Sequence, residues 1–218
     1  MRSQELLSLF EKKLKDPLPG IKAQAFMMPI PRPGHKDVLS LEDDHSKAGV
    51  LILLYLWMKR LYVLLTKRTE RLYHHRAQVS FPGGRQEAQE ILETTAIREA
   101  SEELGISLDA SCILGRLTPL YIPPSNYCVF PFVAFLDERP DFRPSSAEVA
   151  EIIEVPLDHL LDKDNIRREI WTIRGIEIDV PFYEYGEHKI WGATAMIMSE
   201  FLHVWKTVFD LEIDQKTE

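Results

Sequence analysis

Residues 81–106 read Phe-Pro-Gly-Gly-Arg-Gln-Glu-Ala-Gln-Glu-Ile-Leu-Glu-Thr-Thr-Ala-Ile-Arg-Glu-Ala-Ser-Glu-Glu-Leu-Gly-Ile, and this stretch decides the fold. The Pro-Gly-Gly triplet at 82–84 is unfavourable inside a regular element, whereas residues 90–104 contain neither Gly nor Pro. Gly105 suits the position after a helix, because glycine adopts the left-handed conformation without penalty. The sequence therefore predicts a loop that runs into a helix ending near Leu104.

The predicted helix carries three acidic residues on one face. At about 100° per residue, Glu99, Glu102 and Glu103 fall within an arc of about 100°, away from the more apolar side. Like charges three or four residues apart each cost about 0.2–0.5 kcal/mol in an isolated helix, and acids are unfavourable in a last turn. Two interpretations fit this pattern: a solvated acidic face, and a divalent-cation site built from carboxylate oxygens.

The spacing of the fixed residues distinguishes the two interpretations. Gly84, Glu90 and the run Arg98-Glu99-Ala100-Ser101-Glu102-Glu103-Leu104-Gly105-Ile106 resemble the Nudix box, the signature of the Nudix hydrolases. The box spans residues 84–106, and it departs from the family's usual pattern only at Ala100, where a larger aliphatic residue is common. The resemblance favours the cation site.

A fold and a chemistry are implied by this resemblance. The fold would be the Nudix α/β/α sandwich, an α/β architecture with a mixed β-sheet between helices. The reaction would be hydrolysis of a nucleoside diphosphate derivative with Mg²⁺ or Mn²⁺, since a metal neutralises the diphosphate and lowers the pKa of the attacking water. Glu99, Glu102, Glu103 and the Gly84 carbonyl would be the metal ligands, and Glu90 and Arg98 would pair to brace the loop against the helix.

A second stretch, ahead of the box, narrows the substrate. Leu64-Leu65-Thr66-Lys67-Arg68, followed by Leu72, His75, Gln78 and the Ser-Phe-Pro-Gly-Gly at 80–84, resembles the additional signature of the coenzyme A diphosphatase branch. That branch commonly has glycine where this chain has Ala77. For each of Arg68, His75 and Gln78, contact with the substrate and a scaffold role stay open as alternatives.

The substrate implied by this branch is coenzyme A or a derivative, cleaved to adenosine 3′,5′-bisphosphate and a 4′-phosphopantetheine product. A second interpretation keeps the chemistry with another substrate, such as an ADP-sugar, NADH or a dinucleotide, and a third is a Nudix binding module without catalysis. Glu148 and Glu151 follow a Pro-rich loop where Nudix enzymes sometimes keep a further ligand or base. An exposed acid at a strand end is the alternative for both.

Composition bounds the class of protein. The 218 residues, 45% hydrophobic and 28% charged, suit a globular fold, and the net charge of −8 argues against a nucleic-acid binder. The apolar run at 49–66 is too short for a membrane span and is interrupted by Lys59-Arg60, so it predicts a hairpin of two buried strands. Cys112 and Cys128 are interpreted as buried thiols in a reducing compartment, and the cytoplasm is the predicted location.

We expect one domain over residues 1–218, with residues 1–35 forming an N-terminal helical extension and connection. The first helix carries an apolar stripe that packs on the domain or on a partner subunit, so a homodimer is one expectation. Residues 24–47 are predicted to be an extended connection around one short strand. Residues 111–136 and 166–185 are predicted hairpins, the second turning at Gly175, and a C-terminal helix begins after Trp191.

Overall fold

Strand β1 (Ser46–Trp57) is the centre of the fold. The computed structural model describes residues 2–32, 45–69, 78–173 and 175–214. Strand β1 pairs with β2 (Arg60–Arg68) through a two-residue turn in which Met58 and Lys59 have φ of 48° and 64°, as a type I′ turn requires. The predicted hairpin of two buried strands is confirmed.

The main sheet is mixed and has eight strands in the order β3-β2-β1-β7-β5, with β4 paired to β1, β6 to β7 and β8 to β2. Strand β7 (Tyr127–Leu136) runs parallel to β1, and the other pairings are antiparallel. The remaining strands of this sheet are β3 (Val79–Ser80), β4 (Gly83–Arg85), β5 (Ile113–Arg116), β6 (Leu120–Ile122) and β8 (Val149–Pro156).

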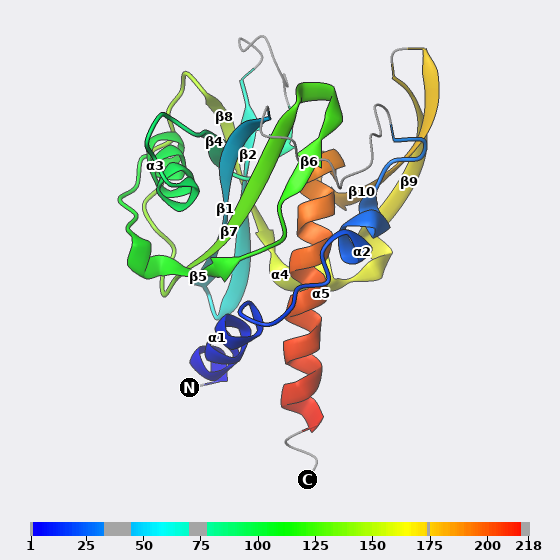
Figure 1. Ribbon diagram of the computed structural model, residues 1–218. Helices are drawn as coiled ribbons and strands as arrows, with labels where there is room; N and C mark the ends of the chain where they lie inside the picture. Colours follow the sequence, from blue (N-terminus) through cyan, green and yellow to red (C-terminus); the bar gives the residue numbers. More distant parts are fainter. Residues whose placement is uncertain (1, 33–44, 70–77, 174, 215–218) are drawn as a thin grey trace.

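Helices cover both faces of this sheet, α3 (Leu92–Leu104) on one and α5 (Gly192–Asp214) on the other (Figure 1). Successive side chains of a strand point to opposite faces, so β1 contributes to two cores. Leu51, Leu53 and Tyr55 join the core under α3, whereas Ile52 and Leu54 join the core under α5. The predicted α/β/α sandwich with a mixed sheet is confirmed.

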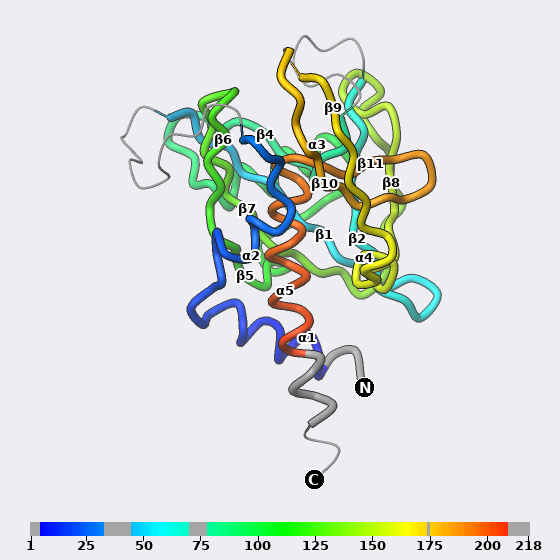
Figure 2. The backbone as a smooth tube through the Cα atoms, turned by 90° about the vertical axis from the view of Figure 1, so that its right-hand side faces the viewer, coloured from blue at the N-terminus to red at the C-terminus, as the bar shows by residue number. Residues whose placement is uncertain are grey.

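The N-terminal helix α1 (Arg2–Lys13) packs on the C-terminal helix α5, and the two lie together at one end of the molecule (Figures 1 and 2). The Phe10 ring centroid lies 5.6 Å from that of Phe201 and 4.8 Å from that of Trp205. Leu7, Phe10 and Leu14 are buried. The apolar stripe is therefore occupied within the chain, and a homodimer stays a prediction without an assigned surface.

The expected extended connection from Gln24 is wrong at its beginning. Gln24 is the last residue of helix α2 (Ile21–Gln24), and the chain continues as the short 3₁₀ helix η1 (Ala25–Met27). Gln24 and Met27 are buried against α5, so tertiary packing outweighs the weak local signal. Extended backbone follows at Ile30, which exchanges two backbone hydrogen bonds with Asp179.

Residues 166–191 form a sheet of their own. The predicted hairpin is present as β9 (Ile166–Ile173) and β10 (Ile176–Tyr185). Strand β11 (His188–Trp191), which was not predicted, adds a third antiparallel strand. The hairpin predicted at 111–136 is also present, but its first strand is divided into β5 and β6. Short helical turns complete the chain: η2 (Ala110–Cys112), η3 (Pro123–Ser125), α4 (Leu157–Leu161) and η4 (Lys163–Asn165).

The two cysteines differ in burial. Cys128 is buried in β7, as expected, whereas Cys112 closes the η2 turn and is only half-buried, with its thiol directed at the Asp109 carbonyl 3.0 Å away. The expectation of a strand-like, buried Cys112 is therefore wrong. Among the described helices, none is long and apolar enough to cross a membrane.

Candidate active site

Helix α3 ends at Leu104, as the sequence predicts. Gly105 has φ of 63°, and its N–H donates to the Ser101 carbonyl. The loop between β7 and β8 also caps this end of α3. The Arg143 N–H donates to the Leu104 carbonyl at 2.8 Å, and the Ser145 N–H donates to the Glu103 carbonyl at 3.0 Å. The acidic last turn of α3 is thus held against residues 143–145, just before Glu148.

The three box glutamates differ in their exposure to solvent. The Glu102 side chain is 64% exposed, that of Glu99 is 20% exposed and that of Glu103 only 4% exposed. Glu103 lies one position from the buried Leu104 and three from the buried Ala100. A uniformly solvated acidic face, the common alternative for such a helix, does not describe this arrangement.

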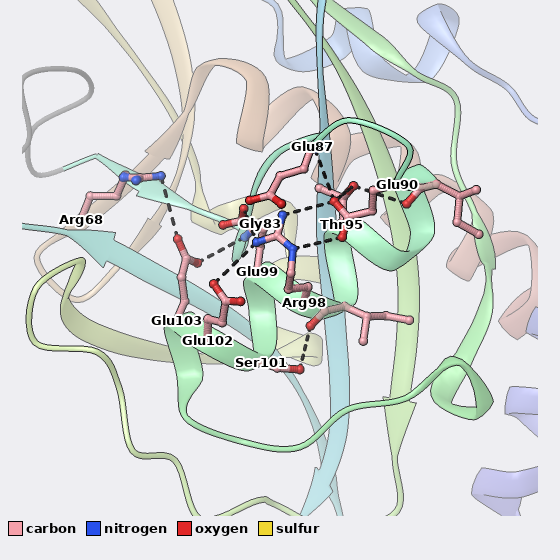
Figure 3. A network of polar contacts seen from close by, with 12 residues as sticks. Arg68, Gly83, Glu87, Glu90, Thr95, Arg98, Glu99, Ser101, Glu102 and Glu103 are labelled. Atoms are coloured by element: carbon pink, nitrogen blue, oxygen red, sulfur yellow. Dashed lines mark hydrogen bonds and ion pairs between the residues drawn. The ribbon is translucent and has the colours of Figure 1, made fainter.

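Glu103 is a buried carboxylate with two nearby donors (Figure 3). Its Oε2 accepts a hydrogen bond from the Gly83 N–H at 3.2 Å, and its Oε1 lies 3.9 Å from Nη1 of Arg68. Burial raises the pKa of Glu103 to about 7, although Arg68 and the Gly83 hydrogen bond act in the opposite direction. A cation bound to this carboxylate in addition to Arg68 would therefore be electrostatically favourable.

Glycines bring the helix close to the strands. A Cβ on Gly84 would lie 2.3 Å from the Glu99 carboxylate, and a Cβ on Gly49 would lie 2.4 Å from the Leu92 carbonyl oxygen. The Glu99 carboxylate therefore rests on the Gly84 backbone, and burial raises its pKa. Gly49 was not predicted as part of this site; its signal in the sequence is a glycine within an apolar strand, where close backbone approach is common.

Arg98 pairs with three carboxylates (Figure 3). Its Nε and Nη2 donate to the two oxygens of Glu90 at 3.0 and 3.2 Å, and its Nη1 lies 2.9 Å from Glu99 and 3.6 Å from Glu102. Thr95 Oγ1 also donates to Glu90 at 2.8 Å. Hydrogen bonds from Arg98 lower the pKa of Glu90 to about 2, so this loop acid is held as a carboxylate.

Of the two acids after the Pro-rich loop, Glu148 lies nearer to the box glutamates: its N–H donates to the Ser145 carbonyl at 3.0 Å, and the Ser145 N–H donates to the Glu103 carbonyl at 3.0 Å. The Glu148 charge raises the pKa of both Glu99 and Glu103, so it lies within their electrostatic range. Glu151 instead contacts His188 and Lys67. His188 belongs to β11, which packs against α5, whereas Glu103 belongs to α3, so Glu151 lies on the face of the sheet away from Glu103.

Arg68 and Gln78 are the remaining sequence candidates that lie in the described part of the chain. Arg68 reaches Glu103, as above, and its backbone N–H donates to the Gln78 carbonyl at 3.3 Å. Gln78 is thereby placed beside the strand that carries Arg68. His75 lies outside the described residues.

The donor set fits a hard divalent cation. Carboxylates of Glu90, Glu99, Glu102, Glu103 and Glu148 outnumber the two guanidinium groups, Arg68 and Arg98, and all side-chain ligands offered are oxygens, as Mg²⁺ and Mn²⁺ prefer. In the described part of the chain, three ligand atoms within 4.8 Å of one another occur elsewhere, at Glu151, Glu187 and His188. The box carboxylates are not gathered around one point in this way, because Glu99 and Glu102 are paired with Arg98. A metal bound at the box would therefore draw both of them away from Arg98.

Comparisons with known proteins agree with the motif. The model of the NUDIX domain family matches residues 45–173. A Photorhabdus laumondii protein, "Uncharacterized Nudix hydrolase NudL", is 35% identical over 176 residues, covering 80% of this chain and 91% of that protein. The human "Mitochondrial coenzyme A diphosphatase NUDT8" is 36% identical over 140 residues, covering 62% of this chain and 59% of that protein.

A solved structure supports the fold alone. The crystal structure of a MutT/nudix family protein from Enterococcus faecalis superimposes with a TM-score of 0.51 at 18% sequence identity, and the match covers 76% of this chain and 62% of that one. At this identity the likeness concerns the path of the backbone.

Proposed function

The chain belongs to the Nudix family and is a hydrolase of diphosphate bonds in nucleoside diphosphate derivatives, and we propose that its substrate is coenzyme A or an acyl derivative. Cleavage would give adenosine 3′,5′-bisphosphate and a 4′-phosphopantetheine product. The observation that carries the proposal is Arg68, a residue of the coenzyme A signature, beside the box acid Glu103. The human relative named as a coenzyme A diphosphatase supports the same substrate class.

The proposed metal ligands are Glu99, Glu102, Glu103 and the Gly84 carbonyl. Mg²⁺ or Mn²⁺ held there would neutralise the diphosphate and lower the pKa of the attacking water. Glu90 would keep Arg98 in place when Glu99 and Glu102 leave it, because the bidentate pair is independent of the metal ligands. Arg68 would contribute positive charge to the substrate's phosphates at the edge of the site.

We assign the general base to Glu148 rather than Glu151. The Glu148 charge acts on both Glu99 and Glu103, and the Thr69 N–H donates to its backbone carbonyl at 3.0 Å, which anchors the residue beside β2. A carboxylate in this place can take a proton from water as the diphosphate is attacked. Glu148→Gln should lower kcat by about a hundredfold or more. The exposed Glu138→Gln, at the start of the same loop, should leave kcat unchanged.

Another nucleotide substrate is the second candidate, and Ala77 favours it, because the coenzyme A signature commonly has glycine there. ADP-sugars and NADH share the diphosphate and the adenosine but lack the 3′-phosphate of coenzyme A. The third interpretation, a binding module without catalysis, gives way to the hydrolase, since the family match and the relatives are those of hydrolases.

The substrate test compares turnover of coenzyme A, ADP-ribose and NADH side by side, each with and without Mg²⁺ or Mn²⁺, with products separated by chromatography. We expect metal-dependent release of adenosine 3′,5′-bisphosphate, with the highest kcat/KM on coenzyme A or acyl-coenzyme A. Turnover of ADP-ribose or NADH with coenzyme A left intact would disprove the coenzyme A assignment while retaining the diphosphatase.

A further inference from the structure

A second group of metal-ligating side chains lies outside the box, where the two sheets meet. Glu151 belongs to β8 of the main sheet, Glu187 to the turn between β10 and β11, and His188 to the first position of β11. One ligand atom from each lies within 4.8 Å of the other two. Residues almost forty positions apart in sequence are therefore gathered at one point.

The imidazole has the least exposed side chain of this group. The His188 side chain is only 10% exposed, and its Nε2 lies 3.1 Å from Oε1 of Glu151. Two ligands bound to one ion at about 2.0–2.2 Å lie roughly 3.0–3.5 Å apart, so this separation already suits a shared metal. His188 and Glu151 therefore supply two ligand atoms that already lie at the right distance for one metal ion.

The charges around the group leave room for a cation. Lys67 lies 3.9 Å from the other Glu151 oxygen, which is a loose contact for an ion pair. Glu187 is exposed and takes part in none of the ion pairs formed among residues that the structure describes. Two carboxylates face one lysine here, and a divalent ion would be a stronger partner for them than the lysine.

We propose that Glu151, Glu187 and His188 bind a divalent transition-metal ion of the Zn²⁺ class. An imidazole and two carboxylates are ligand types that Zn²⁺ binds, and three of them leave one tetrahedral position for water, whereas Mg²⁺ prefers oxygen ligands alone. The site is separate from the box, because Glu151 lies on the face of the sheet away from Glu103. Its ion would clip the β10–β11 hairpin to β8, so its role is structural.

The test is a titration of the full-length protein with Zn²⁺, and in parallel with Co²⁺, in a large excess of Mg²⁺ that occupies all-oxygen sites. We expect one bound Zn²⁺ per chain, a Co²⁺ absorption band typical of nitrogen and oxygen ligands, and a rise in Tm. Glu187→Gln and His188→Gln should each weaken binding at least tenfold. Glu187 is exposed in a turn, so its variant should fold even if His188→Gln does not.

Two controls decide where the ion binds. His203→Gln removes an exposed histidine of α5 and should leave Zn²⁺ affinity unchanged. Glu103→Gln removes a box acid and should also leave it unchanged in excess Mg²⁺. Absence of Zn²⁺ binding, equal binding by Glu187→Gln, or loss of binding in Glu103→Gln would each overturn the proposal. None of these results depends on the substrate of the enzyme.

Discussion

Glu103 is the residue at which burial and charge conflict most in the proposed active site. Its side chain is 4% exposed, and burial raises its pKa to about 7. The Glu103 carboxylate has a loose ion pair with Arg68, at 3.9 Å, and one hydrogen bond from a backbone N–H. These contacts do not fully compensate for the cost of burying its charge. Such a group destabilises the free enzyme and gains most from a bound divalent cation.

Glu103→Gln should therefore separate stability from activity. The amide keeps the size of the side chain and an oxygen that can accept the Gly83 hydrogen bond, so we expect an unchanged or higher Tm. Metal-dependent turnover should fall by at least about a hundredfold, because several kcal/mol of charge stabilisation are lost. Thermal unfolding and kcat are measured on the same preparation, with the exposed Glu177→Gln as a charge-matched control. Retained turnover would contradict the ligand assignment.

Gly84 tests the backbone side of the same site. A methyl group at this position would lie 2.3 Å from the Glu99 carboxylate, so Gly84→Ala must displace that carboxylate. We expect the Mg²⁺ concentration for half-maximal activity to rise about tenfold or more, with a small change in Tm. The neighbouring exposed residue gives the control, since Arg85→Ala removes a longer side chain without entering the site. An unchanged Mg²⁺ requirement in Gly84→Ala would show that Glu99 is not a ligand.

Among the elements, the loop before α3 and the helix itself depend on one ion pair. Arg98 binds Glu90 through two nitrogens, and Thr95 adds a third hydrogen bond, so residues 90–98 are held as a unit. We expect Glu90→Gln to cost about 1–2 kcal/mol of unfolding free energy at pH 7. Urea denaturation of both proteins measures the difference.

The pH dependence of that difference has a defined sign. The pKa of Glu90 is about 2 in the folded protein against 4.5 for an ordinary glutamate, so the unfolded state binds the proton more tightly. The stabilisation is complete above about pH 4.5 and is lost as the pH falls towards 2. Wild type and Glu90→Gln should therefore converge in stability from pH 5 to pH 3. A constant difference across this range would assign the effect to packing.

Elements with strong local signals could be predicted from sequence. The end of α3 follows from Gly105, and the β1–β2 hairpin follows from two apolar runs around Lys59. The 3₁₀ and helical turns at 21–27 could not, because their stability comes from burial of Gln24 and Met27 against a helix far along the chain. Strand β11 is short, and its pairing with β10 depends on the preceding hairpin rather than on its own four residues.

For the molecule as a whole, the proposed site combines local and distant residues. The box acids share one continuous stretch, so sequence alone could place them together. Arg68 and Glu148 join them only through the pairing of β2 with β8, where the register shifts between Lys67 and Arg68 and sets Arg68 opposite Val149. Alternation along the strand cannot be carried across this shift, so it does not assign the faces of Glu148 and Glu151 from sequence. The distinction between Glu148 and Glu151 therefore required the three-dimensional structure.

Glu200 of α5 is completely buried and connects the C-terminal helix to the N-terminal segment around α2. Its carboxylate accepts hydrogen bonds from the Gly20 N–H at 3.0 Å, from Gln24 Nε2 at 2.8 Å, and from the Oγ1 and N–H of Thr118 at 2.6 and 3.3 Å. Four donors around one carboxylate compensate for its burial and fix α2 and the β5–β6 connection to α5.

Glu200→Ala should loosen this junction, because it leaves buried donors without an acceptor. We expect a loss of about 2–4 kcal/mol in the free energy of unfolding, measured in urea by tryptophan fluorescence. Ser199→Ala, on the same helix, removes the hydrogen bond to the Ala23 carbonyl and a polar contact with the Tyr183 hydroxyl but leaves no buried charge network broken, and should cost only about 1 kcal/mol. Since Glu200 belongs to α5 and the box glutamates belong to α3 on the other face of the sheet, kcat of the folded enzyme should be unchanged. Equal losses in the two variants would mean that water replaces the carboxylate, and that the N-terminal segment is held by its apolar contacts instead.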